Sequence, residues 1–410
     1  MDLRKECDWI VKEAIRQVQP DEAVRRALED WTPPAGRLYL VAVGKAAWSM
    51  ARAAYESVGS LVNDGIVITK HGHAQGPIGL LRIREAGHPV PDEDTFSATR
   101  EALELTAGLD ERDGVLFLLS GGGSALFEAP LIPAGELQDI TQRLLACGAD
   151  IVEMNTVRKR LSGVKGGRFA QHCAPAQVFA VILSDIIGDP LDMIASGPAY
   201  PDSSTCADAK RITERYGLPL SVQAAACLER ETPKTLENCR SVVTGSVREL
   251  CRAAGEACRT LGYEPVLLTD SLDCEAREAG AFLAAIARSH QETDRALAFL
   301  AGGETVVHLR GKGKGGRNQE LALAAADGIA GLEGVAVFSV GSDGTDGPTD
   351  AAGGYVDGTT RSRLEKAGWS LYDALKDNNA YPALEACGGL IRTGATGTNV
   401  NDVAVLLIRR

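Results

Sequence analysis

The sequence predicts an α/β protein of two domains, each built as three α/β/α layers. Its 410 residues are two to three times the roughly 150 residues of an average domain. Short apolar runs alternate with longer amphipathic stretches along most of the chain, which is typical of strands covered by helices on both faces. Hydrophobic residues make up 45% of the chain and charged residues 24%, so a folded core is expected throughout.

The first domain is predicted to hold a parallel, Rossmann-like sheet. Its strands are the apolar runs at residues 38–43, 65–69, 115–119 and 177–183. Residues 46–58 are expected to form the helix after the first strand, and strands that are joined through helices run parallel. The amphipathic stretch from residue 2 to about residue 29 is expected to be an N-terminal helix packed on this sheet.

A domain boundary is predicted near Glu231-Thr-Pro-Lys234, because strand and helix patterns start to alternate again after it. We therefore expect one domain over residues 1–236 and a smaller one over residues 237–410. The strand candidates of the second domain are residues 241–245, 265–269, 296–301, 305–309, 335–340 and 403–408.

Composition and charge exclude several classes of protein. The chain has 43 basic and 55 acidic residues and a net charge of −12, which argues against nucleic acid as its main partner. No apolar run approaches the roughly 18–20 residues of a membrane span, and the acidic start resembles no signal peptide. The ten cysteines lack any Cys-x-x-Cys spacing, which favours reduced, structural thiols in a cytoplasmic protein.

Clusters of glycine and polar residues repeatedly follow predicted strands. In open α/β sheets, ligands bind beyond the carboxyl ends of the strands. The sequence therefore predicts an active site at one rim, in a cleft between the two domains. The clusters are Gly44-Lys45, Ser120-Gly-Gly-Gly-Ser124, Ser184-Asp185, Gly302-Gly-Glu304 and Gly341-Ser-Asp-Gly344.

The strongest of these motifs is Ser120-Gly121-Gly122-Gly123-Ser124, which follows a uniformly apolar strand. Three successive glycines let backbone N–H groups converge, and a helix that follows adds a positive dipole end. This pattern favours binding of a phosphate or a carboxylate over the alternative, a flexible turn. We expect the five residues to hold the phosphates of a nucleotide.

Lys45 stands at the end of the first strand, where its amine could reach a phosphoryl oxygen. The motif is not a P-loop, because Ala46 stands where that motif has Ser or Thr and Tyr39 where it has its first Gly. From the residues alone, a solvated lysine in the first turn of a helix is an equal alternative.

The segment from Gly311 to Gly316 has two interpretations. It satisfies the Gly-x-Gly-x-x-Gly pattern of dinucleotide-binding loops, but Asp343 lies farther downstream than the acidic residue of that fingerprint. Lys312, Lys314 and Arg317 crowd the segment with positive charge. Cations among glycines suit a phosphoryl group or a carboxylate better than a nicotinamide cofactor.

Carboxylates follow two of the strands, and Asp185, Asp189 and Asp343 are the candidates for chemistry. Such groups can hold Mg²⁺ or accept a proton from a substrate hydroxyl. The alternative is that most of them cap helices and shape turns. His71 and His73 could bind a metal only with a third ligand from elsewhere in the chain.

Taken together, the motifs resemble the glycerate 2-kinase family, which has an N-terminal glycerate kinase domain and a C-terminal MOFRL domain. The resemblance covers nearly the whole chain and places the MOFRL segment at about residues 296–408. It rests on Val43-Gly-Lys-Ala-Ala47, Glu85-Ala-Gly-His-Pro-Val-Pro-Asp92, Leu119-Ser-Gly-Gly-Gly-Ser-Ala-Leu126, Asn155-Thr-Val-Arg158, Leu161-Ser-Gly-Val-Lys-Gly-Gly167, Ser184-Asp-Ile-Ile-Gly-Asp189, Ala195-Ser-Gly-Pro198, Gly302-Gly-Glu-Thr305, Gly315-Gly-Arg-Asn-Gln-Glu320, Ser342-Asp-Gly-Thr-Asp-Gly-Pro-Thr-Asp350 and Thr396-Gly-Thr-Asn-Val400.

The resemblance implies phosphorylation of D-glycerate at its 2-hydroxyl, with ATP and Mg²⁺, to give 2-phospho-D-glycerate and ADP. It places the essential lysine at Lys45 and the essential arginine at Arg317. Asp185 or Asp343 would hold Mg²⁺ or act as the base, and Asp189 would be a further metal ligand. Lys312 and Lys314 are expected to contact the nucleotide, and homo-oligomers are left open. The alternatives are an NAD(P)H-dependent hydroxypyruvate reductase and a kinase for another small hydroxy acid.

Overall fold

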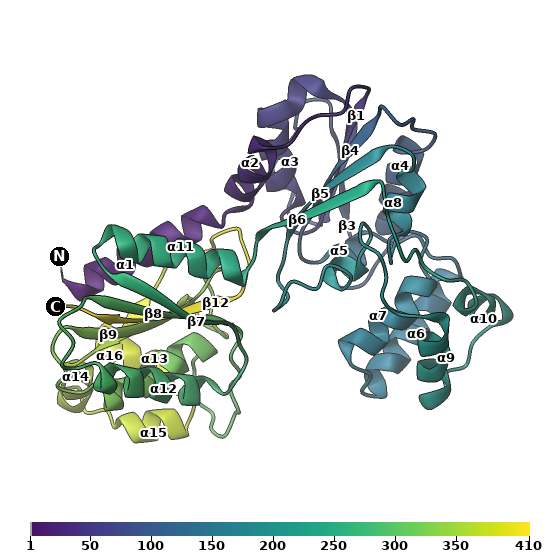
Figure 1. Cartoon of the computed structure of the whole chain (residues 1–410). Coiled ribbons are helices and arrows are strands. Elements are labelled where there is room, and N and C mark those ends of the chain that lie inside the picture. Colours follow the sequence, from purple (N-terminus) through teal and green to yellow (C-terminus); the bar gives the residue numbers. More distant parts are fainter. Residues whose placement is uncertain (1) are drawn as a thin grey trace. The chain divides into compact units, whose positions relative to one another are not determined.

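The computed structural model describes residues 2–410, and the chain divides into two compact units (Figure 1). Unit 1 consists of residues 1–22, 184–188 and 245–410, and unit 2 consists of residues 23–183 and 189–244. Each unit is built around one six-stranded sheet. The predicted fold class, two layered α/β domains with a Rossmann-like parallel sheet in the first, is confirmed.

The sheet of unit 2 has the strand order β3-β2-β1-β4-β5-β6. Strands β1 to β5 pair in parallel, as the alternation with helices predicts. Every residue of β1 and of β4 is buried, since helices cover both faces. The strands are β1 (Leu38–Val43), β2 (Val62–Lys70), β3 (Arg82–Ala86), β4 (Gly114–Leu119), β5 (Gln177–Leu183) and β6 (Cys239–Gly245).

Helices cover both faces of this sheet. On one face α2 and α3 pack against alternate strand residues such as Leu40 and Leu116. On the other face the Phe117 ring packs at a tilt against Phe127 and Phe169, at ring-centre distances of 5.9 and 4.8 Å. The helices of unit 2 are α2 (Pro20–Glu29), α3 (Ala47–Val58), α4 (Glu93–Leu105), α5 (Gly123–Leu126), α6 (Ala134–Ala146), α7 (Ile151–Arg160), α8 (Arg168–Cys173), α9 (Cys206–Arg215) and α10 (Val222–Leu228), with short 3₁₀ turns at Gly59–Leu61 and Ile194–Ser196.

The sheet of unit 1 is mixed and has the order β11-β10-β9-β12-β8-β7. Strand β12 runs antiparallel to both of its neighbours, β8 and β9. The start of β12 therefore lies beside the ends of β8 and β9. The strands are β7 (Glu264–Leu272), β8 (Leu297–Gly303), β9 (Val335–Gly341), β10 (Gly353–Asp357), β11 (Leu390–Ile391) and β12 (Asp402–Ile408).

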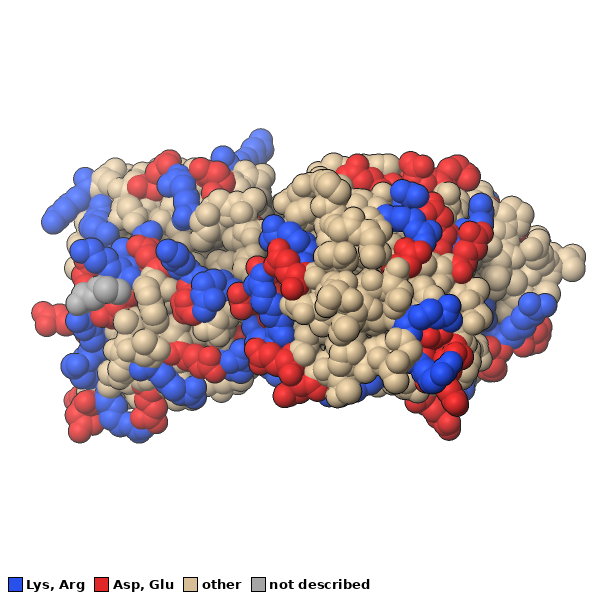
Figure 2. All heavy atoms as spheres, turned by 90° about the horizontal axis from the view of Figure 1, so that it is seen from above, with Lys and Arg blue, Asp and Glu red and all other residues tan. Residues whose placement is uncertain are grey.

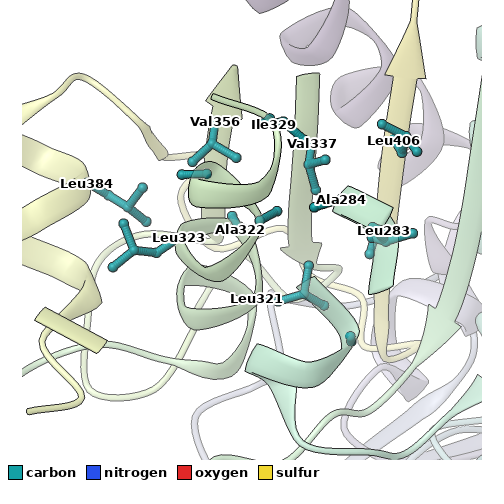
Figure 3. Packing of buried hydrophobic residues seen from close by; sticks show 14 of the residues in the cluster. Leu283, Ala284, Leu321, Ala322, Leu323, Ile329, Val337, Val356, Leu384 and Leu406 are labelled. Atoms are coloured by element: carbon teal, nitrogen blue, oxygen red, sulfur yellow. The ribbon is translucent and has the colours of Figure 1, made fainter. Parts of the chain in front are cut away.

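Two hydrophobic cores lie on opposite faces of this second sheet. Alternate residues of β12 divide between them: Val405 belongs to the core under α1 and α11, and Leu406 to the core under α12 and α13. Figure 3 shows the latter core, in which Leu323 of α13 points toward Leu384 of α16, and Leu321, Val337 and Leu406 belong to the same cluster. The helices of unit 1 are α1 (Leu3–Gln17), α11 (Val247–Thr260), α12 (Ala276–Ser289), α13 (Arg317–Gly328), α14 (Thr360–Lys366), α15 (Leu371–Lys376) and α16 (Ala380–Ala386).

The unit boundaries differ from the division expected between residues 236 and 237. Strand β6 joins the first sheet beside β5, and Val178 N donates to Asn238 O at 2.7 Å. The loop at residues 231–234 is thus an internal loop of unit 2, and its Thr232 Oγ1 donates to the buried Asp202 at 2.7 Å. Proline and polar residues marked a loop here, and not a boundary.

Two element predictions were wrong. The stretch from residue 2 to residue 29 is two helices, α1 and α2, because Pro20 starts a new helix. Cys7, Ile10 and Val11 of α1 pack in unit 1 and not on the first sheet. Residues 305–309 are not a strand, and Leu309 is 82% exposed.

The surface carries acidic and basic side chains interspersed, as the face in Figure 2 shows. All ten cysteines are free thiols. Within residues 2–410, no helix combines the length and hydropathy that a membrane crossing requires.

Candidate active site

In unit 2, two loops meet beyond the ends of adjacent parallel strands. The turn at Gly44 and Lys45 follows β1, and the Ser120–Ser124 loop follows its neighbour β4. Lys45 N donates to Gly121 O at 2.9 Å, and Ala46 N donates to Ser120 Oγ at 3.1 Å. The strand order therefore brings together two motifs that lie about 75 residues apart in the chain.

The contact between the two loops requires a glycine at position 44, beside Ser120. Gly44 has φ +124°, and a Cβ atom there would stand 2.2 Å from Ser120 Oγ. Ser120 is only 3% exposed, and its hydroxyl already accepts from the Ala46 amide. Ser120 thus ties the two loops together through its hydroxyl.

The glycine loop presents two backbone donors. The N–H groups of Gly121 and Gly122 donate no hydrogen bond within residues 2–410, whereas Gly123 N donates to Ser120 O at 3.3 Å. Gly122 adopts φ +87°, a left-handed conformation that suits an anion-binding nest. Helix α5 has four residues, so the dipole expected at its start contributes little.

Lys45 and His88 flank Gly122. A Cβ atom on Gly122 would stand 3.0 Å from His88 Cδ2 and 3.2 Å from Lys45 Cγ. The amine of Lys45 forms no hydrogen bond or ion pair within residues 2–410, while its carbonyl lies 3.2 Å from His73 Nδ1. A lysine side chain without a partner, beside a loop that has two unused amides, is suited to bind an anion.

A buried polar network supports the far side of the loop. Ser124 Oγ lies 3.1 Å from Ser196 Oγ, which donates to Asn155 Oδ1 at 2.9 Å. Arg158 Nη2 donates to Ser124 O at 3.1 Å, and burial lowers the pKa of this guanidinium. Sequence reasoning gave no role to Arg158 or His88, although both lie in motifs of the family pattern.

In unit 1, three acidic residues lie where three strands meet. Register pairs Asp402, the first residue of β12, with Gly303 of β8 and with Gly341 of β9. Glu304 follows β8 directly, and Asp343 follows β9. Oxygens of Asp343 and Asp402 lie 3.3 and 3.4 Å from where a Cβ of Gly341 would stand.

Arg317, the first residue of α13, pairs with two of these acids. Its Nε and Nη2 donate to Asp402 at 2.6 and 3.1 Å, and its Nη1 donates to Glu304 at 2.8 Å. Burial alone would lower the pKa of Arg317, but the hydrogen bond and charge of Asp402 outweigh it and raise that pKa. Burial raises the pKa of Asp402, and Arg317 opposes this rise.

Asp346 occupies the N-terminus of α13. Its carboxylate accepts from Asn318 N at 3.1 Å and from Gln319 N at 2.9 Å. A Cβ at Gly316 would stand 2.2 Å from the Asp346 carboxyl carbon, so glycine is required there. The first amides of this helix are therefore satisfied from within the protein, which argues against a pyrophosphate at this end of the Gly311–Gly316 loop.

The same loop is fixed along its length to the segment at residues 377–379. Gly311 N donates to Asn378 Oδ1 at 3.0 Å, and Lys314 N donates to Asn379 Oδ1 at 3.0 Å. The side chains of Lys312 and Lys314 are exposed, and the Lys314 ammonium lies 4.6 Å from the centre of the Tyr381 ring. The glycines here serve close backbone approach, since a Cβ on Gly311 or Gly313 would clash.

The predicted metal ligands are divided between the two units. Asp185 and Asp343 belong to unit 1, and Asp189 belongs to unit 2. Asp343 Oδ1 accepts from Thr345 N at 2.9 Å, and Asp189 Oδ1 is buried without a hydrogen-bond partner among residues 2–410. Within residues 2–410, the three-ligand group with atoms inside 4.8 Å of one another is His71, Asp92 and Asp94. His71 Nε2 lies 2.9 Å from Asp92 Oδ2, and this contact raises the pKa of His71.

Two family models match the chain. Residues 6–229 match a domain of unknown function, DUF4147, and residues 297–402 match the MOFRL family. The chain is 52% identical to the D-glycerate 2-kinase of Thermotoga maritima, over 99% of this chain and 98% of that protein. It is 40% identical to the glycerate 2-kinase of Pyrococcus horikoshii, over 100% and 98% of the two chains. A relative from Agrobacterium vitis, named a putative hydroxypyruvate reductase, is 39% identical over 96% and 92%.

The crystal structure of the Thermotoga maritima glycerate kinase matches with a TM-score of 0.94, covering 99% of both chains at 52% identity. Together with the fold and the polar clusters at the strand ends, these matches show that the protein is a kinase. The chain belongs to the glycerate 2-kinase family, with both of that family's domains present.

Proposed function

We propose that this protein transfers the γ-phosphoryl group of ATP to the 2-hydroxyl of D-glycerate, giving 2-phospho-D-glycerate and ADP. The observation that carries the proposal, beyond kinship, is the side chain of Lys45 beside Gly122 in the glycine loop. Within residues 2–410, the Lys45 ammonium and the amides of Gly121 and Gly122 have no hydrogen-bond partner. Phosphoryl transfer needs positioning and charge neutralisation more than covalent chemistry from the protein.

The glycine loop would bind a phosphate tail. The amides of Gly121 and Gly122 supply neutral donors, and Lys45 supplies a charge that can follow the moving phosphoryl group. Arg158 adds a second cation below the loop, where it already holds Ser124 O. His88, beside Gly122, is placed to contact the same anion.

Only the Nη1 group of Arg317 would be open to a substrate. Asp402 takes Nε and Nη2 and is 8% exposed, so this bidentate pair is fixed. Glu304, which takes Nη1, is 46% exposed and therefore bound weakly. A glycerate carboxylate or a phosphoryl oxygen would compete with Glu304 for Nη1 and leave Asp402 in place.

The carboxylates of unit 1 fit a magnesium ion. Asp343 Oδ2 accepts no hydrogen bond within residues 2–410, and Mg²⁺ in kinases typically takes one or two carboxylates together with phosphate oxygens and water. Asp343 is thus our first candidate ligand, with Asp185 of the same unit and Asp189 of unit 2 as further candidates. When bound, the ion would neutralise the phosphate charge that develops during transfer. Asp343 or Asp185 would otherwise accept the hydroxyl proton.

Lys45 and Arg317 are proposed to serve one reaction, so the loss of either should strongly reduce turnover. Lys312 and Lys314 would contribute, as exposed cations, to the attraction of nucleotide. The ten free thiols suit the reducing cytoplasm, where we expect the protein to act.

The assay couples the product to enolase. The protein is incubated with D-glycerate and Mg·ATP, and enolase converts 2-phosphoglycerate to phosphoenolpyruvate, which absorbs in the ultraviolet. We expect the absorbance of phosphoenolpyruvate to rise when enolase is the only coupling enzyme. A signal that appears only after phosphoglycerate mutase is added would mean that the 3-hydroxyl is phosphorylated. Oxidation of NAD(P)H by hydroxypyruvate, without release of ADP, would instead support the reductase.

A further inference from the structure

A left-handed turn packs against the glycine loop of unit 2. Ala195, Ser196 and Gly197 follow one another with φ of +49°, +62° and +64°. The turn contacts α5, and a Cβ on Gly123 would stand 2.7 Å from the Cβ of Ala195. Residues with a Cβ disfavour this conformation, and those held in it tend to gather at functional sites. The chain therefore keeps two unfavourable residues where this turn meets the glycine loop.

The hydroxyl groups of Ser124 and Ser196 form a chain of hydrogen bonds with a defined direction. Ser196 is 0% exposed, and its hydroxyl donates to Asn155 Oδ1 at 2.9 Å. A serine hydroxyl has one proton, so Ser196 Oγ must be the acceptor in its 3.1 Å contact with Ser124 Oγ. Ser124 is thus the donor, and the Asn155 side chain sets the orientation of both hydroxyl groups.

Helix α7 holds Ser124 at two points. Asn155 and Arg158 lie three residues apart on this helix, a spacing that places both on the same face. Arg158 Nη2 donates to the Ser124 carbonyl at 3.1 Å. Asn155 reaches the Ser124 hydroxyl through Ser196. The backbone and the side chain of one residue of the glycine loop are therefore both fixed from α7.

The backbone of the turn is held without help from the Ser196 hydroxyl. Gly166 N donates to Ser196 O at 3.0 Å. Gly167 N donates to Gly197 O at 2.7 Å. Loss of the hydroxyl should therefore leave the turn in place and free only the side chain of Ser124.

From these observations we propose that Ser196 is a positioning residue for the glycine loop. Its hydroxyl, oriented by Asn155, holds Ser124 in place. The amides of Gly121 and Gly122, earlier in the same loop, thereby stay aligned for a phosphate group. Ser196 acts through Ser124 and does not itself contact the ligand. The inference rests on the proposed function, because it takes the glycine loop as the phosphate site.

Two substitutions separate positioning from a purely structural role. Ser196→Ala and Ser196→Gly both remove the hydroxyl. Alanine keeps a Cβ in the left-handed conformation, whereas glycine adopts this conformation without strain. The midpoint of thermal unfolding should therefore be higher for Ser196→Gly than for Ser196→Ala. If Ser196 positions the loop, the two variants should nevertheless bind ATP equally weakly.

Calorimetric titration of the full-length protein with Mg·ATP measures this binding without requiring turnover. We expect the Kd of both variants to be about tenfold higher than that of the wild type, because each has lost one hydrogen bond that supports the loop. Ser241→Ala is the matched control. Its hydroxyl donates to Ala199 O at 3.0 Å, also in unit 2, and its loss should leave the Kd unchanged.

The outcomes distinguish this inference from the proposed function. Wild-type affinity in both Ser196 variants overturns the inference. So does a Kd that follows stability, with Ser196→Gly close to the wild type and only Ser196→Ala weakened. A wild type that binds Mg·ATP but forms no phosphoglycerate contradicts the proposed function, while the affinities still decide the role of Ser196. A wild type that does not bind Mg·ATP overturns both.

Discussion

Arg317 and Asp402 form a bidentate ion pair, with Nε and Nη2 of the arginine 2.6 and 3.1 Å from the two carboxylate oxygens. The pair joins the first turn of α13 to the first residue of β12. Because Asp402 is nearly buried, the guanidinium plane is fixed before any ligand arrives. A prealigned cation of this kind costs no reorganisation when charge develops in a transition state.

Asp402→Ala should therefore impair both stability and turnover. Arg317 loses its two-point partner, and breaking hydrogen bonds to a charged group costs about 2 kcal/mol of unfolding free energy. We expect this loss in urea titrations, together with a fall in kcat. Asp350→Ala is the matched control, since exposed Asp350 pairs with exposed Arg392 and such pairs contribute roughly 0–1 kcal/mol. Equal effects of the two substitutions would deny Asp402 its positioning role.

Lys45→Ala should strongly reduce turnover and leave the fold intact. The Lys45 amine has no partner within residues 2–410, so its removal breaks no ion pair. Loss of one electrostatic contact to a transition state costs about 10²–10³-fold in kcat. Steady-state kinetics and thermal unfolding measure the two effects. Lys376→Ala removes an exposed lysine in unit 1 and should change neither. A Lys45→Ala enzyme within threefold of wild type would remove this lysine from the mechanism.

Gly122→Ala should disturb the anion site specifically. The substitution strains a left-handed backbone (φ +87°), at about 1 kcal/mol, and its methyl group meets His88 and Lys45. Gly108→Ala imposes similar strain at φ +65° but meets no atom within 4 Å. Both variants should lose similar stability in urea titrations. Only Gly122→Ala should raise the KM for ATP, and a similar KM for both variants would count against the glycine loop as the phosphate site.

Asp346 should make stability depend on pH. Burial raises its pKa to about 6, from an ordinary value near 4, despite the amides of Gln319 and Asn318 that favour the charged form. The folded state then binds the proton more tightly than the unfolded state does. Its contribution to stability is full below about pH 4 and is lost as the pH rises through about 6.

The comparison of wild type with Asp346→Asn isolates this effect. Urea titrations at a series of pH values should show the stability of the wild type, relative to the variant, falling by up to about 3 kcal/mol between pH 4 and pH 7. The variant keeps an acceptor for the α13 amides but cannot titrate. Parallel stability curves for the two proteins would show that Asp346 has an ordinary pKa.

Much of the fold follows from local pattern. The apolar runs at residues 38–43 and 177–183 coincide with β1 and β5, because strands buried on both faces are uniformly apolar. The partition into units could not be predicted in the same way. Whether α1 packs on one sheet or the other depends on contacts with residues such as Leu250, which lie far away in sequence.

The part of the candidate site that consists of single sequence motifs, each forming one loop, could be predicted from the sequence. Gly44, Lys45 and the Ser120–Ser124 loop meet, as their positions after neighbouring strands suggested. The partners of Arg317 were not predictable, because Asp402 reaches it only through the antiparallel course of β12. In the Gly311–Gly316 pattern, the glycines at 311 and 316 make room for Asp377 and Asp346, which no local pattern indicated.

The most direct test of the central claim is the phosphorus NMR spectrum of the product that forms from ATP and D-glycerate. A phosphate ester at the 2-position couples to the single proton on that carbon, so we predict a new doublet that grows as ATP is converted to ADP. A triplet, from coupling to the two protons of the 3-position, or the absence of any new phosphate ester, would contradict the account.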